Sequence, residues 1–246
     1  MLSIPRDLWV SIPGGNYGKI NTAYQIGEGV RLPGGGPELA RQTVERLLGV
    51  PIDYFAQIDF SAFVRLIDEI GGVKIDVAEE LEVDIYDDDK GKIKIKAGVQ
   101  TLPGEHALAY ARARGTEGGD FDRADRQQQV IMGVFKRVLE FNMIPTLLQK
   151  APTLYAELSS GINTNMDLNE AIKLAWLVKD IPPGEINKGI IGAEHVAFGK
   201  SPDGLDILKP LPDKIRVLRD EVFSIEAATR MDQASSMDPE ELMVQE

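Results

Sequence analysis

The chain has 246 residues and a formal net charge of −12. Its hydrophobic content of 43% and charged content of 27% are ordinary for a soluble globular protein, and its acidic balance argues against general nucleic-acid binding, which favours a basic face. Because the chain has no cysteine, it has no disulfide, thiolate metal site or cysteine nucleophile.

The first residues predict short extended segments around a charged loop. Residues 1–13 fit the end of one strand, a loop and a second short strand, because Pro5 favours extended geometry at Ile4. Arg6 and Asp7 then follow a strand end, where α/β folds tend to bind ligands. The glycines that come next, between positions 14 and 18, predict a loop.

An alternating order of helices and strands follows this loop. Apolar spacing predicts helices from about Glu38 to Leu48 and from Phe60 to Ile70, and strands from Ile52 to Ile58 and from Val73 to Val77. This order implies an α/β layered domain.

Residues 78–90 are strongly acidic, but they lack the D-x-D-x-D-G spacing of a calcium loop and therefore predict a solvated turn. A half-buried or edge strand is expected where Ile93 and Ile95 alternate with lysines. Pro103 suits the first position of a short helix that continues through Tyr110.

The second half of the chain is predicted to be mainly helical. We expect helices from about Asp125 to Asn142, Ile144 to Leu158, Leu168 to Lys179 and Asp213 to Phe223, and a late strand from Ile186 to Ile191. Asp167 and Glu170 fit a capping box for the third helix, and Asp213 is expected to cap the last. The expected organisation is one domain over residues 1–223 and an acidic disordered tail over residues 224–246.

The stretch from Tyr110 to Gln128 concentrates arginines in an acidic chain. Its arginines are interleaved with aspartates: Arg112, Arg114, Arg123 and Arg126, with Asp120, Asp122 and Asp125. In extended chain Arg112 and Arg114 would point to one side, and at a helix start Arg123 and Arg126 would share one face. Arginine forks onto phosphate oxygens with two parallel hydrogen bonds. The pattern predicts a site for an anionic group such as a phosphate or pyrophosphate.

The alternative is that these arginines pair with neighbouring acids on a solvated face. Other sites find no support in the sequence. Position 194 is a glutamate where a P-loop ending at Gly199-Lys200-Ser201 requires glycine. His106 and His195 lack metal-ligand spacing, and no G-x-S-x-G elbow is present. The pattern therefore predicts no metal ligands.

Several short motifs occur in a specific order along the chain. They are Ser3–Asp7 (SIPRD), Lys19–Asn21 (KIN) with Ala23–Tyr24, Thr43–Glu45 (TVE), Leu47–Ile52 (LLGVPI), Gly71–Val73 (GGV), Leu108–Arg114 (LAYARAR) and Gly119–Gln127. In this order, over roughly residues 2–177, the chain resembles the LytR–CpsA–Psr family of bacterial cell-envelope phosphotransferases.

The resemblance implies a fold, an activity and a location. The fold would be a central mixed β-sheet flanked by helices in three α/β/α layers, with an apolar pocket for a prenyl chain. The activity would be that of an enzyme that transfers a polyprenyl-pyrophosphate-linked glycopolymer to peptidoglycan or another wall glycan by forming a phosphodiester. The partners would be this polymer, the acceptor glycan and, through an N-terminal anchor, the membrane, with no nucleic acid. The location would be the cell envelope, on the extracytoplasmic face of the membrane.

The resemblance also implies roles for residues in the matching motifs. The pyrophosphate would be held by Arg6, Arg112, Arg114 and Arg123, with Asp120 as the acidic member of the site. Substrate binding around this group would involve Lys19, Asn21, Arg126 and Gln127.

A magnesium ion is the cofactor that the resemblance implies. In the family, aspartates on a strand pair before the SIPRD motif bind it, whereas this chain begins at Met1, shortly before Ser3. We therefore expect the magnesium ligands and the membrane anchor to lie upstream, with Asp7, Asp120 and Asp122 as alternative ligands. A second possible function is a non-catalytic binder of polyprenyl phosphate or anionic glycan in the cell envelope. A third possible function, transcriptional regulation, is not supported, because the sequence has no helix-turn-helix pattern and no basic face.

Overall fold

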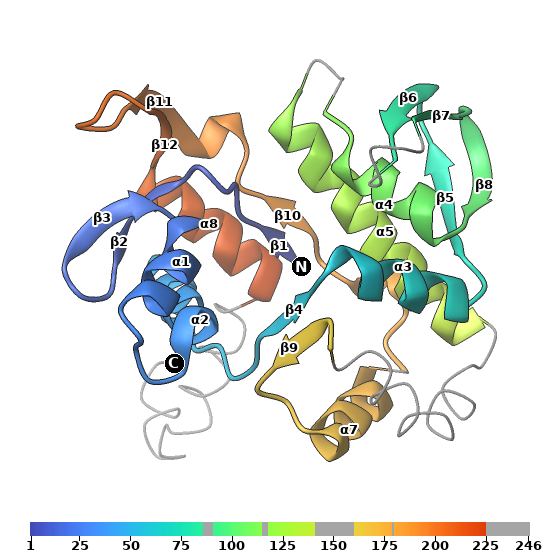
Figure 1. The fold of residues 1–246 in the computed structure, drawn as a ribbon, viewed down its shortest axis with the longest axis horizontal. Coiled ribbons are helices and arrows are strands. Elements are labelled where there is room, and N and C mark those ends of the chain that lie inside the picture. The colour runs from blue at the N-terminus through green and yellow to red at the C-terminus, as the bar shows by residue number, and fades with distance from the viewer. Residues whose placement is uncertain (86–90, 115–117, 141–159, 179, 225–246) are drawn as a thin grey trace, which may run out of the picture.

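The computed structural model describes residues 1–85, 91–114, 118–140, 160–178 and 180–224 (Figure 1). Its strands are β1 (Leu2–Ser3), β2 (Trp9–Ile12), β3 (Asn16–Lys19), β4 (Ala56–Ile58), β5 (Val73–Val77), β6 (Leu81–Asp84), β7 (Lys92–Ile95), β8 (Gly98–Leu102), β9 (Ile162–Thr164), β10 (Gly189–Ile190), β11 (Val196–Lys200) and β12 (Asp206–Pro210). Its helices are α1 (Thr22–Gly29), α2 (Gly35–Leu48), α3 (Phe60–Glu69), α4 (Gly104–Arg112), α5 (Asp120–Glu140), α7 (Leu168–Val178) and α8 (Pro212–Phe223), with 3-10 helices η2 (Pro183–Glu185) and η3 (Ala193–His195). The mixture confirms the predicted α/β class.

The described strands pair in twos and use both directions. β1 and β10 are parallel, whereas β2 pairs with β3, β4 with β9, β5 with β8, β6 with β7 and β11 with β12 in antiparallel register. A parallel bridge between Leu8 and Leu208 connects the segment after β1 to β12. The two ends of the described chain therefore lie against each other.

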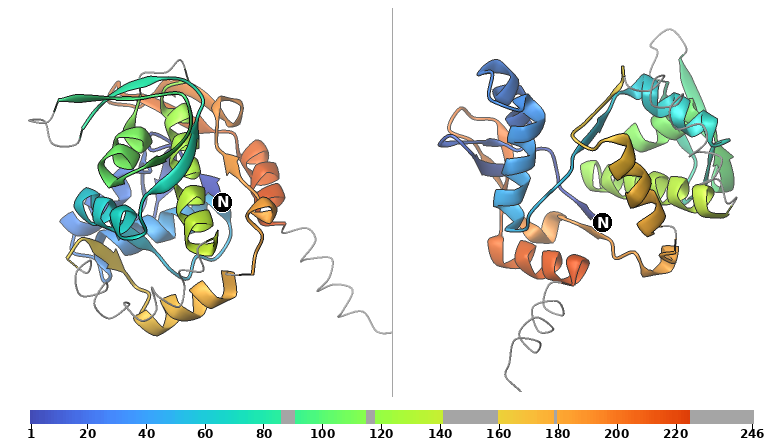
Figure 2. Two further views of the ribbon diagram at one scale, coloured as in Figure 1. Left: turned by 90° about the vertical axis from the view of Figure 1, so that its right-hand side faces the viewer. Right: turned by 90° about the horizontal axis from the view of Figure 1, so that it is seen from below.

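The first of two hydrophobic clusters lies between α3, α4 and α5 and the strands β5 to β8. Alternation along β5 buries Val73, Ile75 and Val77 and leaves the intervening side chains exposed. Figure 2 shows α4 and α5 lying beneath these curved strands. The buried members of this first cluster are Ile67, Ile70, Val73, Ile75, Val77, Val83, Ile95, Leu102, Ala107, Ala109, Tyr110, Ala113 and Val130.

The second cluster lies among β2, α1, α2, α8 and the residues around β10 and β11. Its buried members are Leu8, Val10, Ile12, Ala23, Leu39, Leu48, Ile191, Val196 and Ile215. Phe121, at the start of α5, packs against this second cluster, although Val130 of the same helix belongs to the first. The two groups of elements lie on either side of the N-terminus (Figures 1 and 2), and α5 contacts both.

Two helices begin earlier than predicted. α2 begins at Gly35, and α5 begins at Asp120 rather than near Asp125. The earlier start of α5 brings Asp120 and Asp122 into its first turn, where their charge complements the positive end of the helix dipole. Gly119, with a φ of 55°, supplies the left-handed turn that leads into α5.

Several hairpins were missed. β3 lies within the predicted glycine loop. No strand was predicted for β6, β8, β11 or β12, whereas β7 coincides with the strand predicted around Ile93 and Ile95. Conversely, β4 and β10 occupy only part of the strands predicted over Ile52–Ile58 and Ile186–Ile191. Short strands of mixed polarity are set by packing and cross-strand context rather than by a period of their own, so a local pattern does not reveal them.

The predicted caps differ in their outcome. The capping box of α7 is confirmed, because the Asp167 amide donates to Glu170 Oε2 and the Glu170 amide donates to Asp167 Oδ1, both at 2.8 Å. The cap predicted at Asp213 is wrong, since α8 begins at Pro212 without a side-chain cap. The predicted helix over residues 144–158 and the tail over residues 225–246 lie outside the described residues.

Candidate functional site

Three segments that are far apart in the sequence meet beside the start of α5. The loop after β1 supplies Arg6 and Asp7, the end of β3 supplies Lys19, and the connection from α4 into α5 supplies the remaining charges. Two backbone hydrogen bonds align the first two segments: the Ile20 amide donates to the Leu8 carbonyl at 2.8 Å, and the Asn21 amide donates to the Arg6 carbonyl at 3.3 Å. Both bonds continue the antiparallel pairing of β2 with β3, and this pairing brings Lys19 next to Asp7.

Asp7 is the acid of the first half of the site. Its Oδ1 lies 3.0 Å from Lys19 Nζ and 4.0 Å from Arg6 Nε. The Lys19 side chain is largely buried, whereas the Arg6 side chain is 52% exposed. Arg6 can therefore reorient toward a ligand, while Lys19 stays beside Asp7.

Asp120 is the acid of the second half. Its Oδ1 lies 2.9 Å from Arg123 Nη1, one turn along α5, and 3.7 Å from Arg114 Nε. The Arg123 side chain is only 13% exposed, whereas that of Arg114 is 58% exposed. The carboxylate thus brings a largely buried and an exposed guanidinium together.

The charges of both halves act on Arg123. Burial lowers the pKa of the Arg123 guanidinium, Asp120 raises it, Arg114 and Arg6 lower it further, and Asp7 raises it. Arginine remains protonated in proteins. Arg123 and its neighbouring arginines therefore concentrate positive charge in a site that is partly shielded from water. This site favours an anionic ligand that can accept several charge-assisted hydrogen bonds.

Arg112 does not lie where the sequence predicted. It is the last residue of α4, so the extended segment predicted to contain both Arg112 and Arg114 is wrong at Arg112. The Arg112 guanidinium lies over the ring of Phe60 in α3, with 4.9 Å between Cζ and the ring centroid. This cation–π contact holds it at the α3 side of the α4–α5 connection.

Arg126 and Gln127 contact the backbone of the α4–α5 connection. Arg126 is buried and donates from Nη2 to the Ala113 carbonyl at 2.6 Å. Gln127, which is exposed, donates from Nε2 to the Ala111 carbonyl at 3.3 Å. Arg126 thus supports the residue immediately before Arg114 from inside the protein.

A protein-family model matches most of the chain. The model of the LytR_cpsA_psr family matches residues 1–220. This chain belongs to the LytR–CpsA–Psr family.

Two curated relatives are longer than this chain. It is 30% identical over 223 residues to the polyisoprenyl-teichoic acid–peptidoglycan teichoic acid transferase TagT of Bacillus subtilis (strain 168), covering 90% of this chain and 63% of TagT. It is 36% identical over 168 residues to the regulatory protein MsrR of Staphylococcus aureus (strain COL), covering 68% of this chain and 46% of MsrR. The chain therefore spans about half to two thirds of the length of these relatives.

Solved structures of the LytR–CpsA–Psr family share the fold. The crystal structure of B. subtilis TagV superposes with a TM-score of 0.71 at 29% identity, covering 91% of this chain and 83% of TagV. The structure of TagT bound to LI-WTA superposes with a TM-score of 0.66 at 29% identity, covering 90% of this chain and 76% of that one.

Gln128, next to the candidate residue Gln127, is a buried polar residue that the sequence did not reveal. It is 4% exposed, and its Nε2 donates to Ser3 Oγ at 2.8 Å and to the Gly189 carbonyl at 2.7 Å. The amide thus connects α5 to both strands of the β1–β10 pair. Its spacing of seven residues from Phe121 places both side chains on one face of α5, and this is the signal that could have identified it.

Magnesium, which the LytR–CpsA–Psr family implies, does not fit the residues described. No group of three or more histidine, cysteine, aspartate or glutamate side chains that could hold a metal ion occurs among them. The two carboxylates beside the arginines, Asp7 and Asp120, are ion-paired with Lys19 and Arg123. We therefore assign no metal ligand within the described part of the chain.

No helix in the described ranges is both long enough and apolar enough to cross a lipid bilayer.

Proposed function

We propose that this chain binds a polyprenyl-pyrophosphate-linked glycopolymer and transfers the polymer to a hydroxyl of peptidoglycan or another wall glycan. The observation that supports this function is the convergence of four cationic side chains around two carboxylates: Arg6, Lys19, Arg114 and Arg123, with Asp7 and Asp120. The name of TagT, a polyisoprenyl-teichoic acid–peptidoglycan teichoic acid transferase, supports the same activity.

In the proposed reaction, the acceptor hydroxyl oxygen attacks the phosphorus nearest the polymer. A new P–O bond forms, the bond to the bridging oxygen breaks, and polyprenyl phosphate leaves while the hydroxyl proton passes to a base. Phosphoryl transfer depends mainly on positioning and on neutralising the charge that develops on the phosphoryl oxygens. Arg114 and Arg123 would neutralise this charge, and Arg6 and Lys19 would hold the second phosphate.

The role proposed for Asp120 is to orient these arginines. Its Oδ1 lies between the guanidinium groups of Arg123 and Arg114, so it fixes both against the same point in space. Asn21 and Gln127 are proposed to contact the substrate around the pyrophosphate, and Arg112 and Arg126 to complete the cationic environment. No step in this mechanism passes through a metal ion.

We further propose that the reaction takes place at the extracytoplasmic face of the membrane, where a lipid-linked polymer and peptidoglycan are both accessible. This location follows from the chemistry of the two substrates, since a polyprenyl chain is retained by the bilayer and peptidoglycan lies outside it.

A transfer assay tests the proposed function. The purified chain is incubated with a radiolabelled lipid-linked teichoic acid precursor and a peptidoglycan oligomer, and labelled oligomer is measured. Arg123→Ala should lower transfer about 100-fold, because it removes a charge-stabilising donor from the reacting phosphate. Lys94→Ala, which removes an exposed cation on β7, should transfer like the unaltered chain. Equal transfer by Arg123→Ala would contradict the proposal.

A second candidate function is binding of polyprenyl phosphate or anionic glycan without turnover. The observation in its favour is that both carboxylates of the site are engaged by cations, so neither is placed as an unengaged base for the acceptor hydroxyl. This candidate predicts that the unaltered chain binds farnesyl pyrophosphate but yields no labelled oligomer in the transfer assay.

A further inference from the structure

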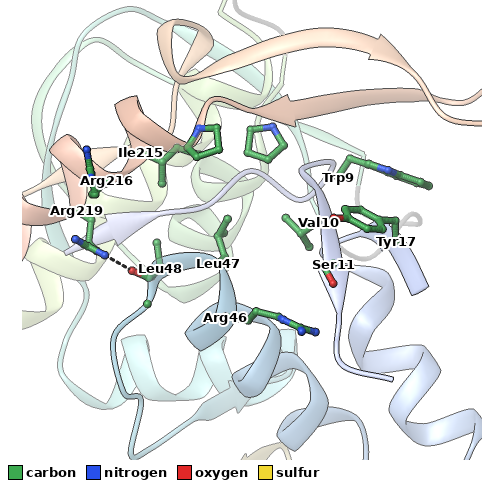
Figure 3. A pocket seen from close by; sticks show the side chains of 13 residues that line it. Trp9, Val10, Ser11, Tyr17, Arg46, Leu47, Leu48, Ile215, Arg216 and Arg219 are labelled. Carbon is green, nitrogen blue, oxygen red and sulfur yellow. Dashed lines mark hydrogen bonds between the residues drawn. The ribbon is translucent and has the colours of Figure 1, made fainter. Parts of the chain in front are cut away.

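A cavity of about 390 Å³ lies outside the charged site, between the β2–β3 hairpin, the end of α2 and the start of α8 (Figure 3). A cavity of this size suits a small ligand or a short segment of a polymer. Its apolar lining comes from Val10, Leu47, Leu48, Ile215 and the prolines at positions 210 and 212.

The polar lining of this cavity is cationic. Arg46, Arg216 and Arg219 line it, and no aspartate or glutamate does, although the chain as a whole carries a net charge of −12. Arg216 and Arg219 pair with Asp213 and Asp220, which lie outside the lining. The cationic character of the lining, which favours anionic ligands, therefore rests mainly on Arg46.

The three arginines differ in how far they are already engaged. Arg219 is largely buried, donates from Nη1 to the Leu48 carbonyl at 2.6 Å and is ion-paired with Asp220 at 2.5 Å. Arg216 is exposed and lies 3.6 Å from Asp213. Arg46, which is exposed in the last turn of α2, forms no ion pair or hydrogen bond with the residues that the structure describes. Arg46 is therefore the cation of this cavity best able to bind a ligand.

Two aromatic side chains line the same cavity. Trp9 and Tyr17 project from one face of the β2–β3 hairpin, because Trp9 is opposite Lys19 and Ser11 is opposite Tyr17 in the register. The Tyr17 side chain is 67% exposed. Exposed aromatic rings offer flat apolar faces, which suit the apolar faces of sugar rings.

The hairpin also connects this cavity to the charged site. Side chains directly opposite each other in an antiparallel pair have Cβ atoms about 5 Å apart, so Trp9 lies beside Lys19, whose Nζ is 3.0 Å from Asp7 Oδ1. Tyr17 lies two residues further along β3, which corresponds to about 7 Å. A chain of sugars that leaves a phosphate at the charged site would reach this cavity within a few bonds.

We infer that this cavity binds an anionic segment of a glycan, with sugar rings against Trp9 and Tyr17 and an acidic substituent on Arg46. The inference rests on the proposed function, because it assumes that the polymer extends from the phosphate at the charged site toward this cavity. The cavity would then be a second contact region for the same substrate. Such a region would fix the polymer at a distance from the reacting phosphate and select polymers that carry charge.

Tryptophan fluorescence provides a direct readout. The chain contains two tryptophans, so Trp176→Phe leaves Trp9 as the sole reporter. In this background, tetragalacturonate is titrated as the anionic glycan probe, and its fully methyl-esterified form is the matched neutral probe. We expect Trp9 fluorescence to change with tetragalacturonate and to change at much higher concentration with the ester, because only the acid form pairs with Arg46.

Two variants test the lining. Arg46→Ala and Tyr17→Ala should each weaken tetragalacturonate binding about tenfold, since each removes one strong contact. Lys94→Ala, a loss of one exposed cation on β7, should bind within about twofold of the unaltered chain. The inference is overturned if both lining variants bind like the unaltered chain, if the neutral ester binds equally well, or if Trp9 does not respond.

A second titration separates this inference from the proposed function. Arg114→Ala should lose affinity for farnesyl pyrophosphate and keep its affinity for tetragalacturonate, and Arg46→Ala should do the reverse. Binding of farnesyl pyrophosphate without tetragalacturonate would overturn the cavity inference alone. Binding of tetragalacturonate without farnesyl pyrophosphate would overturn the proposed function and leave the cavity as a glycan site. Loss of farnesyl pyrophosphate binding in Arg46→Ala would mean that the cavity holds the prenyl chain, which also overturns the inference.

Discussion

At the scale of single residues, the charged site depends on how each arginine is held. Arg123 is buried against Asp120, Arg114 is exposed beside the same carboxylate, and Arg112 lies over Phe60. The same residue type therefore serves three purposes within a short stretch of chain. Substitutions should separate them, because an exposed guanidinium contributes to binding with little effect on folding, whereas a buried one contributes to both.

The first prediction concerns Arg114. Arg114→Ala should weaken binding of farnesyl pyrophosphate by about 1.5–3 kcal/mol, the contribution of a charge-assisted hydrogen bond, with little change in melting temperature because the side chain is 58% exposed. Arg114→Lys should restore only part of the affinity, because an ammonium group cannot form the two parallel hydrogen bonds of a guanidinium. Titration calorimetry measures both variants, and unchanged affinity in Arg114→Ala would remove it from the site.

The second prediction concerns Phe60 as a positioning residue for Arg112. Phe60→Leu keeps an apolar side chain but removes the aromatic face beneath the guanidinium, and should weaken farnesyl pyrophosphate binding by about 0.5–1 kcal/mol. Phe60→Tyr keeps the face and should bind normally. If Phe60→Leu and Phe60→Tyr lose equal affinity, the contact serves packing and not the orientation of Arg112.

At the scale of elements, the sequence predicted the helices and strands that have strong apolar periodicity. α3 and β5 lie where the spacing indicated, because both bury one face in the first cluster. The sequence placed the start of α5 too late because an aspartate-rich, glycine-preceded segment resembles a turn, although acidic residues are favoured in the first turn of a helix. The same error hid the ion pair between Asp120 and Arg123, which needs a helical turn between them.

The site was predicted in part for a related reason. The arginine-rich stretch and the SIPRD segment are recognisable from residue type, so Arg6, Arg114 and Arg123 could be named as candidates. The pairing of β2 with β3, which brings Lys19 to Asp7, depends on a register that local patterns do not contain. The burial of Arg126 was likewise not predictable, because a buried arginine and an exposed one look alike in a sequence.

The third prediction concerns an ionic network on α2. Hydrogen bonds from Arg41 and then from Gln42 lower the pKa of Glu38 to about 2, so its charge contributes stability that is present above its unfolded pKa of 4.5 and is lost as the pH falls toward 2. Glu38→Gln should therefore melt at a lower temperature than the unaltered chain at pH 7, and the difference should shrink between pH 4.5 and 2. Glu79→Gln, an exposed glutamate, serves as the control, and a difference that stays constant with pH would contradict the prediction.

At the scale of the whole molecule, two hydrophobic clusters are joined through α5. Phe121 packs against the second cluster while Val130 lies in the first, and Gln128 connects the helix to the β1–β10 pair. These contacts of α5 should therefore contribute to the relative placement of the two groups of elements. The arginine site lies at the same junction.

The fourth prediction tests this junction. Gln128→Leu keeps the volume but leaves the Gly189 carbonyl and Ser3 hydroxyl without their donor, and should cost about 1–3 kcal/mol of unfolding free energy. Gln127→Leu, the exposed neighbour on the same helix, should change stability by less than about 0.5 kcal/mol. Urea unfolding measures both. Equal stability of the two variants would show that the buried amide does not hold the two groups together.

The charged site draws Arg6 and Lys19 from one group of elements and Arg123 from a helix that spans both. A pyrophosphate that contacts all three would act as a cross-link whose strength depends on concentration. By mass action, a ligand present at 100 times its dissociation constant adds about 2.7 kcal/mol to the unfolding free energy. The occupied protein would then resist proteolysis and heat more than the empty one, so its lifetime would follow the supply of its own substrate.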